Sequence, residues 1–386
     1  MKNSKHKILT VILALLLALS LAACGGGGGG SDKQDPSAYE EAYPVAIEAK
    51  YDLVYHFSEG LAPVMLDRKW GYIDKTGEEV IPLIYDVAWE FSDGLGLVKI
   101  DDKFGYIDKT GEEVIPLQFC GAAPFSEGFA RVRYEENVDP GILYIDKTGA
   151  ELTSLFYSAE PFSEGLACVQ DGMMNYVFID TTGAQVIDIE PTNYRGREFS
   201  EGLSLVYHMG PIGFMDKTGA IAIPLEGITM SIDVEDFSEG LAYIDKVGFE
   251  GFIDTTGAEV ITLGEEAGLV KSFSEGLAVV SLWGREWSYI DKTGEIVIQR
   301  ECDWAYSFNE GYAAIEFDGK IGFINKENEV VVPFQFDMVD MDDLTMEEME
   351  DLDNVAADSA IHQYKVSEGM AAIMVGDKWG FIAMPQ

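Results

Sequence analysis

The stretch that decides the fold is FSEGLAPVMLDRKWGYIDKTGEEVIPL, residues 57–83. Its opening motif, Phe-Ser-Glu-Gly, recurs along the chain with single-residue changes, and the nine copies begin at Phe57, Phe91, Phe125, Phe162, Phe199, Phe237, Phe273, Phe308 and Val366. Copies lie about 36 residues apart, except for a longer step before the last, and such a period indicates a repeat architecture. Because stacked repeats form one continuous body, the 386 residues need not divide into several globular domains.

Within this stretch, three segments have the composition of β-strands separated by turns. Apolar, aromatic and β-branched residues favour extended structure over residues 61–66, 70–73 and 78–83. Asp74-Lys75-Thr76-Gly77 is the clearest turn, because the aspartate side chain can bond the backbone two residues on and the glycine supplies a positive φ. Pro82 lacks a backbone donor, so we expect it at a sheet edge or at the end of a strand.

The second hairpin of the repeat recurs along the chain with the same turn chemistry. An aspartate opens each predicted turn and a glycine closes it, in the pairs Asp74 and Gly77, Asp108 and Gly111, Asp146 and Gly149, Asp180 and Gly183, Asp216 and Gly219, Asp254 and Gly257, and Asp291 and Gly294. In the next copy Asn325 and Asn328 take these places, and asparagine also tolerates the left-handed conformation. We interpret all these residues as structural turn positions.

Three short strands cannot bury an apolar face alone, so neighbouring repeats must stack. The sequence predicts an all-β fold of about nine tandem three-stranded repeats. We favour an open, superhelical or solenoid array, since nine units would be many for a closed ring; the alternative is a closed, propeller-like ring. Residues 43–52 resemble a third strand without its first two, while the last copy, residues 366–386, lacks a third strand. A ring could use that split to join its ends.

The recurring phrase Trp-Gly-(Tyr/Phe)-Ile-Asp-x-x-Gly, followed by Val-Ile-Pro and by Phe-Ser-Glu-Gly-Leu-Ala, resembles the WG-repeat family of bacterial proteins. The resemblance covers residues 44–386 and implies an all-β array with a surface or interaction role and no catalytic residues. Tryptophan precedes the glycine at Trp70 and Trp379, whereas Trp287 precedes Ser288. We therefore interpret the tryptophan as a packing position rather than a ligand platform, because other copies have Phe104, Ile212, Glu250 or Ile321 there.

The N-terminus predicts export and lipid anchoring. Residues 1–23 combine three lysines with an apolar run, the form of a secretory signal peptide. The run ends Leu21-Ala22-Ala23-Cys24, which resembles the lipobox of bacterial lipoproteins and implies a diacylglyceryl group on Cys24; the alternative is an ordinary signal peptide. Residues 24–42 begin with six glycines after the cysteine and read as a flexible tether. We expect the repeat array, residues 43–386, at the extracytoplasmic face of the cell membrane.

The net charge of −42 bears on the partners of the protein. Such a surface repels nucleic acid, so we expect no nucleic-acid partner. Residues 338–360 interrupt the repeat with nine acidic residues and no basic one, and they lack the EF-hand pattern. They are interpreted as a solvated acidic insertion, with a cation site or a dock for a basic partner as the alternative.

The sequence contains no recognisable catalytic, metal-binding or cofactor-binding motif. Cys120, Cys168 and Cys302 lie far apart and are interpreted as small buried hydrophobic residues. The aspartates and glutamates recur with the repeat, and active sites are singular, so we expect a protein that is not an enzyme. The leading hypothesis is a lipid-anchored binding scaffold whose partner is a protein or cell-wall glycan. The alternatives are a calcium-dependent or cation-dependent surface module and an extracellular hydrolase.

Overall fold

The computed structural model describes residues 42–135, 140–189, 194–208, 210–226, 234–264, 267–282, 286–338 and 364–385. The chain divides after Glu41 into two units, and the description below concerns the second, which begins at Ala42. The predicted signal peptide, Cys24, the tether up to residue 41 and the acidic insertion beyond Met338 therefore lie outside the described residues. In the part of the chain that is described, no helix is long and apolar enough to cross a membrane.

Each repeat forms a small antiparallel sheet. Unit 1 contains β2 (Leu53–Val54), β3 (Leu61–Leu66), β4 (Lys69–Asp74) and β5 (Glu79–Tyr85), paired in that order. The three longer strands lie where the sequence predicts them, and β5, which contains Pro82, lies at the sheet edge. The expectation of three strands is wrong, because the two-residue strand β2 pairs with β3 as a fourth. Two residues are too few to show a strand periodicity.

The described residues form eight sheets, and one of these contains both unit 8 and unit 9. Units 2 to 4 have these strands: for unit 2, β6 (Val87–Ala88), β7 (Gly96–Ile100), β8 (Lys103–Ile107) and β9 (Glu113–Phe119); for unit 3, β10 (Gly121–Ala122), β11 (Phe129–Arg133) and β12 (Ile142–Asp146); and for unit 4, β13 (Ser158–Ala159), β14 (Leu166–Gln170), β15 (Tyr176–Asp180) and β16 (Gln185–Asp188). Units 5 to 7 follow: for unit 5, β17 (Arg195–Gly196), β18 (Leu203–Tyr207), β19 (Pro211–Asp216) and β20 (Ile221–Pro224); for unit 6, β21 (Leu241–Lys246), β22 (Phe249–Asp254) and β23 (Glu259–Thr262); and for unit 7, β24 (Ala267–Val270), β25 (Leu277–Leu282), β26 (Glu286–Asp291) and β27 (Ile296–Glu301). The last two units are, for unit 8, β28 (Trp304–Ala305), β29 (Tyr312–Phe317), β30 (Lys320–Asn325) and β31 (Val330–Asp337), and for unit 9, β32 (Val366–Ser367), β33 (Met370–Val375), β34 (Lys378–Ala383) and β1 (Ile47–Tyr51).

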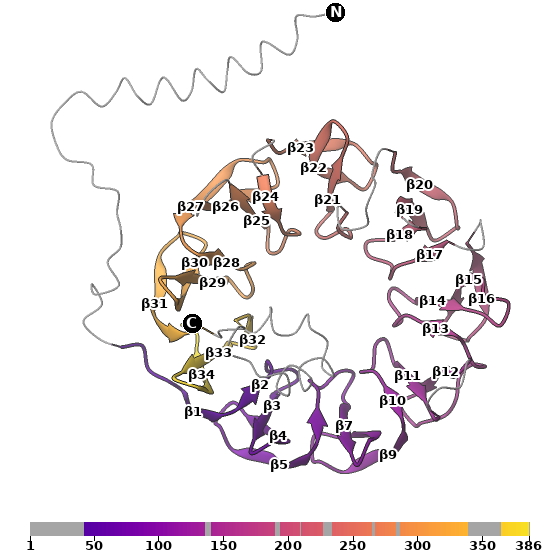
Figure 1. Cartoon of the computed structure of the whole chain (residues 1–386), viewed down its shortest axis with the longest axis horizontal. Helices are drawn as coiled ribbons and strands as arrows, with labels where there is room; N and C mark the ends of the chain where they lie inside the picture. The colour runs from indigo at the N-terminus through magenta and orange to yellow at the C-terminus, as the bar shows by residue number, and fades with distance from the viewer. Residues whose placement is uncertain are drawn as a thin grey trace, which may run out of the picture. The chain divides into compact units, whose positions relative to one another are not determined.

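The first strand of the body completes the last sheet. Strand β1 pairs antiparallel with β34, with Ile47 opposite Phe381 and Tyr51 opposite Trp379. The predicted open array is therefore wrong, and the body that begins at Ala42 closes into a ring of sheets (Figure 1). The physical reason is burial: an open array would leave one apolar sheet face exposed at each end.

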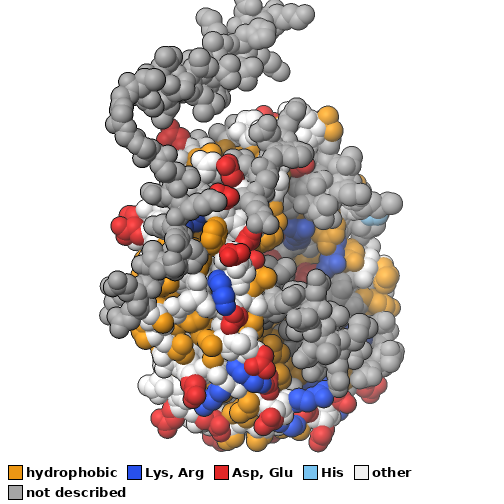
Figure 2. All heavy atoms as spheres, turned by 60° about the vertical axis from the view of Figure 1, so that its left-hand side comes forward, with side chains coloured by type: hydrophobic (Ala, Val, Ile, Leu, Met, Phe, Trp, Pro, Cys, Tyr) orange, Lys and Arg blue, Asp and Glu red, His pale blue; other side chains and the backbone are white. Residues whose placement is uncertain are grey.

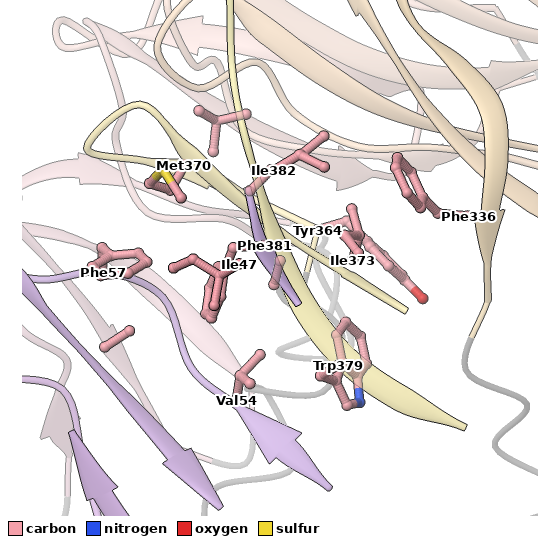
Figure 3. Close-up of a cluster of buried hydrophobic side chains, with 14 of the residues drawn as sticks. Ile47, Val54, Phe57, Phe336, Tyr364, Met370, Ile373, Trp379, Phe381 and Ile382 are labelled. Atoms are coloured by element: carbon pink, nitrogen blue, oxygen red, sulfur yellow. The ribbon is translucent and has the colours of Figure 1, made fainter. Parts of the chain in front are cut away.

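The seam of the ring is as apolar as a core. Ile47 and Phe57 from the beginning of the body lie beside Phe381 and Ile373 from its end (Figure 3). All four belong to one cluster of buried side chains. The split of the last repeat between the two ends of the body therefore joins strands that lie far apart in sequence.

Aromatic pairs join successive sheets. Tyr72 of β4 meets Phe91, the first residue of the next Phe-Ser-Glu-Gly motif, with ring centroids 4.9 Å apart in an edge-to-face geometry. The same contact closes the seam between Phe381 and Phe57, at 5.0 Å. Equivalent pairs are Tyr106–Phe125, Tyr144–Phe162, Phe178–Phe199, Phe214–Phe237, Phe252–Phe273 and Tyr289–Phe308. Edge-to-face pairs contribute beyond the burial of area, so the repeated phenylalanine links neighbouring units at eight of the nine junctions, and Val366 stands in its place at the ninth.

The Trp-Gly dipeptide of the repeat is explained by packing. Trp70 is only 4% exposed and stacks on Tyr55 of the same unit, with ring centroids 5.1 Å apart. A Cβ on Gly71 would lie 2.5 Å from the carbonyl oxygen of Ile81, so the neighbouring strand requires glycine there. Trp287 is also buried, and its place in β26 matches that of Trp70 in β4. The tryptophan is thus a packing residue in three units.

Candidate functional site

The predicted turn residues occupy one repeated local structure. The Oδ1 atom of Asp74 accepts hydrogen bonds from the backbone N–H and hydroxyl of Thr76, at 2.9 and 2.6 Å, and from the N–H of Glu78 at 3.0 Å. Gly77 has φ 83° and donates its N–H to the Asp74 carbonyl oxygen at 2.9 Å. This is a type I turn closed by a left-handed glycine, as the sequence predicts.

The hydrogen bonds of the turn lower the pKa of these aspartates. The hydroxyl hydrogen bond from Thr76, followed by the backbone hydrogen bonds, holds the pKa of Asp74 below its usual value. The same direction and leading cause apply to Asp108, Asp146, Asp180, Asp216, Asp254 and Asp291. The turn glycines share the left-handed conformation at Gly111, Gly149, Gly183, Gly219, Gly257 and Gly294. These residues lie one pair to a unit, so the structure does not bring them together as a site.

The Phe-Ser-Glu-Gly motif forms a tighter turn than the sequence suggests. Ser58 and Leu61 exchange both backbone hydrogen bonds, at 2.9 and 3.2 Å. Glu59 and Gly60 between them have φ 53° and 93°, which is the two-residue type I′ hairpin. A left-handed glutamate is strained, yet an acidic residue takes this conformation in all nine copies, at Glu59, Asp93, Glu127, Glu164, Glu201, Glu239, Glu275, Glu310 and Glu368.

These acidic side chains link the units into a closed circuit. The Glu59 carboxylate accepts the N–H of Gly94 in the next unit at 3.1 Å, and the Glu368 carboxylate accepts the N–H of Gly60 across the seam at 3.1 Å. The intervening links run from Asp93 to Gly128, Glu127 to Gly165, Glu164 to Gly202, Glu201 to Gly240, Glu239 to Gly276, Glu275 to Gly311 and Glu310 to Gly369. Because each of these carboxylates binds a backbone N–H of the following unit, we interpret them as structural and call them the clamp carboxylates.

The serine of the motif makes a second circuit. Ser58 donates its hydroxyl to the carbonyl oxygen of Phe91 at 2.7 Å, and Ser367 donates across the seam to Phe57 at 2.8 Å. Ser92, Ser126, Ser163, Ser200, Ser238 and Ser274 bond the following unit in the same way. Asn309 replaces the serine in unit 8, and its amide instead donates to Ser307 within the same unit.

Lysines from the aspartate turns neutralise several clamp carboxylates. Lys109 lies 3.0 Å from Glu59, and Lys75 lies 2.9 Å from Glu368. Burial alone would raise the pKa of Glu59, but the hydrogen bonds from Lys109 and Gly94 outweigh burial and lower it. On the face seen in Figure 2, acidic and basic side chains likewise lie beside one another among apolar and uncharged groups. Much of the repeated acidity is therefore committed to structure.

One residue in β11 breaks the repeat. Arg131 occupies a position that is uncharged in every other unit, at Pro63, Leu97, Cys168, Leu205, Tyr243, Val279, Ala314 and Ala372. Its Nη1 atom donates to the Ala159 carbonyl oxygen of unit 4 at 2.6 Å and lies 3.7 Å from Glu160 Oε2. Burial lowers the pKa of Arg131 from its ordinary value. The sequence signal that could have revealed it is an arginine at an apolar repeat position.

Further charged side chains follow Arg131 in the next units. Arg195 pairs with Glu160, and Arg197 Nη1 lies 3.5 Å from Asp236 Oδ2. We call these residues, together with Arg131 and Glu198, the charged arc: Arg131, Glu160, Arg195, Arg197, Glu198 and Asp236. Burial raises the pKa of Glu198 and of Asp236, although nearby arginines oppose the rise. The sequence analysis missed this arc because its members come from four different repeats, which only the stacking of those repeats brings together.

A surface hollow of about 210 Å³ adjoins the arc. It lies over unit 3 and is lined by Gly121, Ala122, Ala123, Arg131, Val132, Arg133, Ile142 and Ala159. Most of its wall is apolar, and arginine supplies its charge. Such a hollow is able to receive an apolar group that also carries a negative charge.

Two observations concern the cysteines and the other residue types that bind metals. In these ranges no group of three His, Cys, Asp or Glu side chains is placed to hold a metal ion. Cys168 and Cys302 are buried free thiols, and Cys120 is half-buried. Burial raises the pKa of the Cys168 and Cys302 thiols to about 12. The interpretation of these two cysteines as buried hydrophobic residues is therefore confirmed.

Comparison with known proteins gives one family match. The model of the WG containing repeat matches residues 45–70, 70–104, 104–137, 144–172, 287–320 and 321–342. The unmatched stretch between residues 172 and 287 contains Arg195, Arg197, Glu198 and Asp236 of the charged arc. The part of the ring that departs most from the repeat is thus the part that carries most of the arc.

Curated proteins and solved structures give less information about this chain than the family model does. No curated protein matches the chain. A structure described as the eukaryotic initiation factor is similar, with TM-score 0.43 and 10% identity, covering 72% of this chain and 83% of that chain. BamB from Moraxella catarrhalis is similar with TM-score 0.36 and 11% identity, covering 88% and 92%. Both TM-scores are below 0.5, so neither likeness carries a functional argument.

Proposed function

Because this is an all-β protein that contains WG repeats, we propose that it is a non-enzymatic binding scaffold. In this proposal a lipid on Cys24 anchors the protein at the extracytoplasmic face of the cell membrane. Residues 25–42 then act as a tether that gives the ring reach. The partner is a protein or cell-wall glycan.

The observation that supports binding is the contrast between repeated and unrepeated side chains. The repeated carboxylates are committed to turns and to the circuit between units, as Asp74 and Glu59 illustrate. The charged arc and its hollow are instead confined to units 3–6. A region whose charged side chains the repeat does not account for fits recognition of one partner.

A retention experiment tests this function. Residues 32–386, immobilised, are exposed to purified cell wall and separately to envelope protein extract, across salt concentrations. We expect retention of one of the two, reduced when Arg197→Ala and Asp236→Ala are introduced together. A matched control is the pair Lys109→Ala and Glu59→Ala, which removes an ion pair of the circuit whose two residues do not belong to the arc. Retention of nothing on either material would contradict the proposal.

Anchoring is tested separately. Cys24→Ala is expected to release the protein from the membrane fraction, because the acyl chains are lost. Ser31→Ala in the tether serves as the control and should stay in that fraction. A Cys24→Ala protein that remains in the membrane fraction would refute the lipid anchor.

The extracellular hydrolase stays a second candidate because of Glu198 and Asp236. Both carboxyls have a raised pKa, and the charge of Asp236 contributes to that of Glu198. Raised carboxyl pKa values suit a general acid in glycoside hydrolysis. Release of reducing sugar from wall glycan, abolished by Glu198→Gln and by Asp236→Asn, would establish this function in place of binding.

The cation-dependent module is the remaining candidate, and its basis is the acidic insertion. Addition of millimolar calcium should raise the melting temperature if a site exists there. An unchanged melting temperature would remove this candidate.

A further inference from the structure

The hollow over unit 3 exists because an aromatic ring is missing. Two residues before the phenylalanine of the motif, unit 1 has Tyr55 and unit 2 has Trp89. Trp89 packs on Phe104 of the same unit, with ring centroids 5.9 Å apart. Unit 3 has Ala123 in that position, and Ile142, which stands where Phe104 stands in unit 2, lines the hollow beside it.

The neighbouring residues of unit 3 enlarge the vacancy. Strand β10 is Gly121-Ala122, whereas β2 of unit 1 is Leu53–Val54. Ala159 of unit 4 closes the far side, and it is as small as the residues opposite. The hollow is therefore an apolar cradle with the location and lining expected for one side chain of the aromatic or branched aliphatic type.

The charge of the cradle comes from arginine. Arg131 and Arg133 both line it. The guanidinium of Arg131 donates Nη1 to the Ala159 carbonyl oxygen. Glu160, whose carboxylate also pairs with Arg195, lies 3.7 Å from that nitrogen, and the charge of Glu198 also acts on Arg131. A guanidinium carries five N–H donors in a planar fork that matches a carboxylate. The charged side chains that line the hollow itself are both arginines, so the lining favours an anion.

We propose that this hollow binds an aromatic or branched apolar group that carries a carboxylate. The apolar body takes the place that Trp89 fills in unit 2, and the carboxylate meets the fork of Arg131. This inference rests on the proposed binding function and names the ligand class of the same arc. The chemistry is shared by a free aromatic acid and by the C-terminal residue of a peptide that ends in phenylalanine.

Titration calorimetry of the full chain carrying Cys24→Ala tests the ligand class. The probes are phenylacetate, its neutral analogue phenylacetamide, and benzylamine. We expect phenylacetate to bind about tenfold more tightly than phenylacetamide, because a charge-assisted hydrogen bond to Arg131 is worth about one power of ten. Benzylamine should bind weakest. Equal affinity for the acid and the amide, or no binding of either, would overturn the proposal.

Two further probes separate the sources of the carboxylate. Gly-Gly-Phe is offered with a free C-terminus and with an amidated one. A preference for the free acid peptide supports a chain terminus as the ligand. Binding of phenylacetate without binding of the peptide supports a free aromatic acid.

The repeat supplies the matched variants. Ala123→Trp introduces the residue of unit 2 and should abolish binding of all probes, because the ring fills the hollow. Arg131→Leu introduces the residue found at Leu97 and should remove the preference for the acid while keeping the weak binding of the amide. Melting temperatures show whether each variant folds, and Ala123→Val provides a smaller filling if Ala123→Trp does not. An Arg131→Leu variant that keeps the acid preference would overturn the assignment.

A control hollow without arginine is also available. Trp89→Ala in unit 2 removes the ring over Phe104, and the nearby residue there is Leu97. With Arg131→Leu in the same chain, acid and amide should bind this hollow alike.

The outcomes distinguish this inference from the proposed function. Retention on wall or envelope protein without probe binding would refute the ligand class and leave the scaffold function standing. Probe binding with the stated preference but no retention on either material would leave the site standing and refute the scaffold function.

Discussion

Closure of the ring predicts that an isoleucine at the beginning of the body behaves as a core residue. Ile47 in β1 is 5% exposed, and it lies against the aspartate turn of unit 1, where a Cβ on Gly77 would come within 3.1 Å of its Cγ2 atom. Ile81 in β5 is 0% exposed and lies against Gly111 of unit 2 in the same way, at 3.3 Å. The two residues make matching contacts with a turn glycine, but only Ile47 lies in a strand whose partner, β34, comes from the other end of the body.

The expected magnitude follows from burial. Replacing a buried isoleucine by alanine removes apolar contacts and leaves a cavity, which costs about 2–5 kcal/mol. We therefore expect Ile47→Ala and Ile81→Ala to lower the free energy of unfolding by similar amounts, on the order of 3 kcal/mol each. In an open array Ile47 would lie on an unpaired end, and its replacement would cost about 0.5 kcal/mol or less.

Urea unfolding followed by tryptophan fluorescence measures both variants on the Cys24→Ala chain. Val80→Ala, at the exposed position beside Ile81, is the control and should leave the midpoint almost unchanged. A large loss for Ile81→Ala together with a negligible loss for Ile47→Ala would refute closure through β1 and β34.

Three further predictions concern stability. Ser288 Oγ is buried without a hydrogen-bond partner in the described residues. Ser288→Ala should therefore raise the free energy of unfolding, measured in urea, by about 1 kcal/mol. A lower free energy of unfolding would show that the hydroxyl has a partner. Asn309→Ser should restore the missing hydroxyl link to the carbonyl of Val366 and add about 1 kcal/mol, with no gain counting against the circuit. The pKa of Glu59 is lowered in the fold, so its contribution to stability is present above its unfolded pKa of about 4 and is lost as pH falls further. Glu59→Gln should therefore weaken the fall in the free energy of unfolding at acid pH. An acid branch of the stability curve that does not change would contradict this.

The charged arc contributes with the opposite sign. The pKa of Glu198 is raised by burial, so its ionised form is less favourable in the fold than in the unfolded chain. The folded chain gains stability from protonation of Glu198 as pH falls through its raised pKa. Protonation of Glu59, Glu164, Glu239 and Glu368, whose pKa values are lowered in the fold, has the opposite effect. Such an arrangement reduces stability at neutral pH, which is usual where charged groups are kept for recognition rather than for the fold.

The sequence by itself determined the repeat and most of what happens inside one unit. The aspartate turn is fixed by residues within four positions of one another, so Asp74, Thr76 and Gly77 could be interpreted without a neighbour. The three longer strands followed from composition for the same reason. The two-residue strand β2 and the type I′ turn at Glu59 escaped, because a left-handed glutamate has no local signature and is explained by its bond to Gly94 in the next unit.

Only the tertiary structure decided closure and the candidate site. The split last repeat made a ring conceivable, yet pairing of β1 with β34 depends on how each sheet is turned against the next, accumulated over the whole circle. No local pattern encodes that sum. Arg131, Glu160 and Arg195 likewise come from separate units, and their proximity results from the stacking of those units. Local hydrogen bonds are set by neighbours in the chain, whereas closure and the arc are set by burial between sheets.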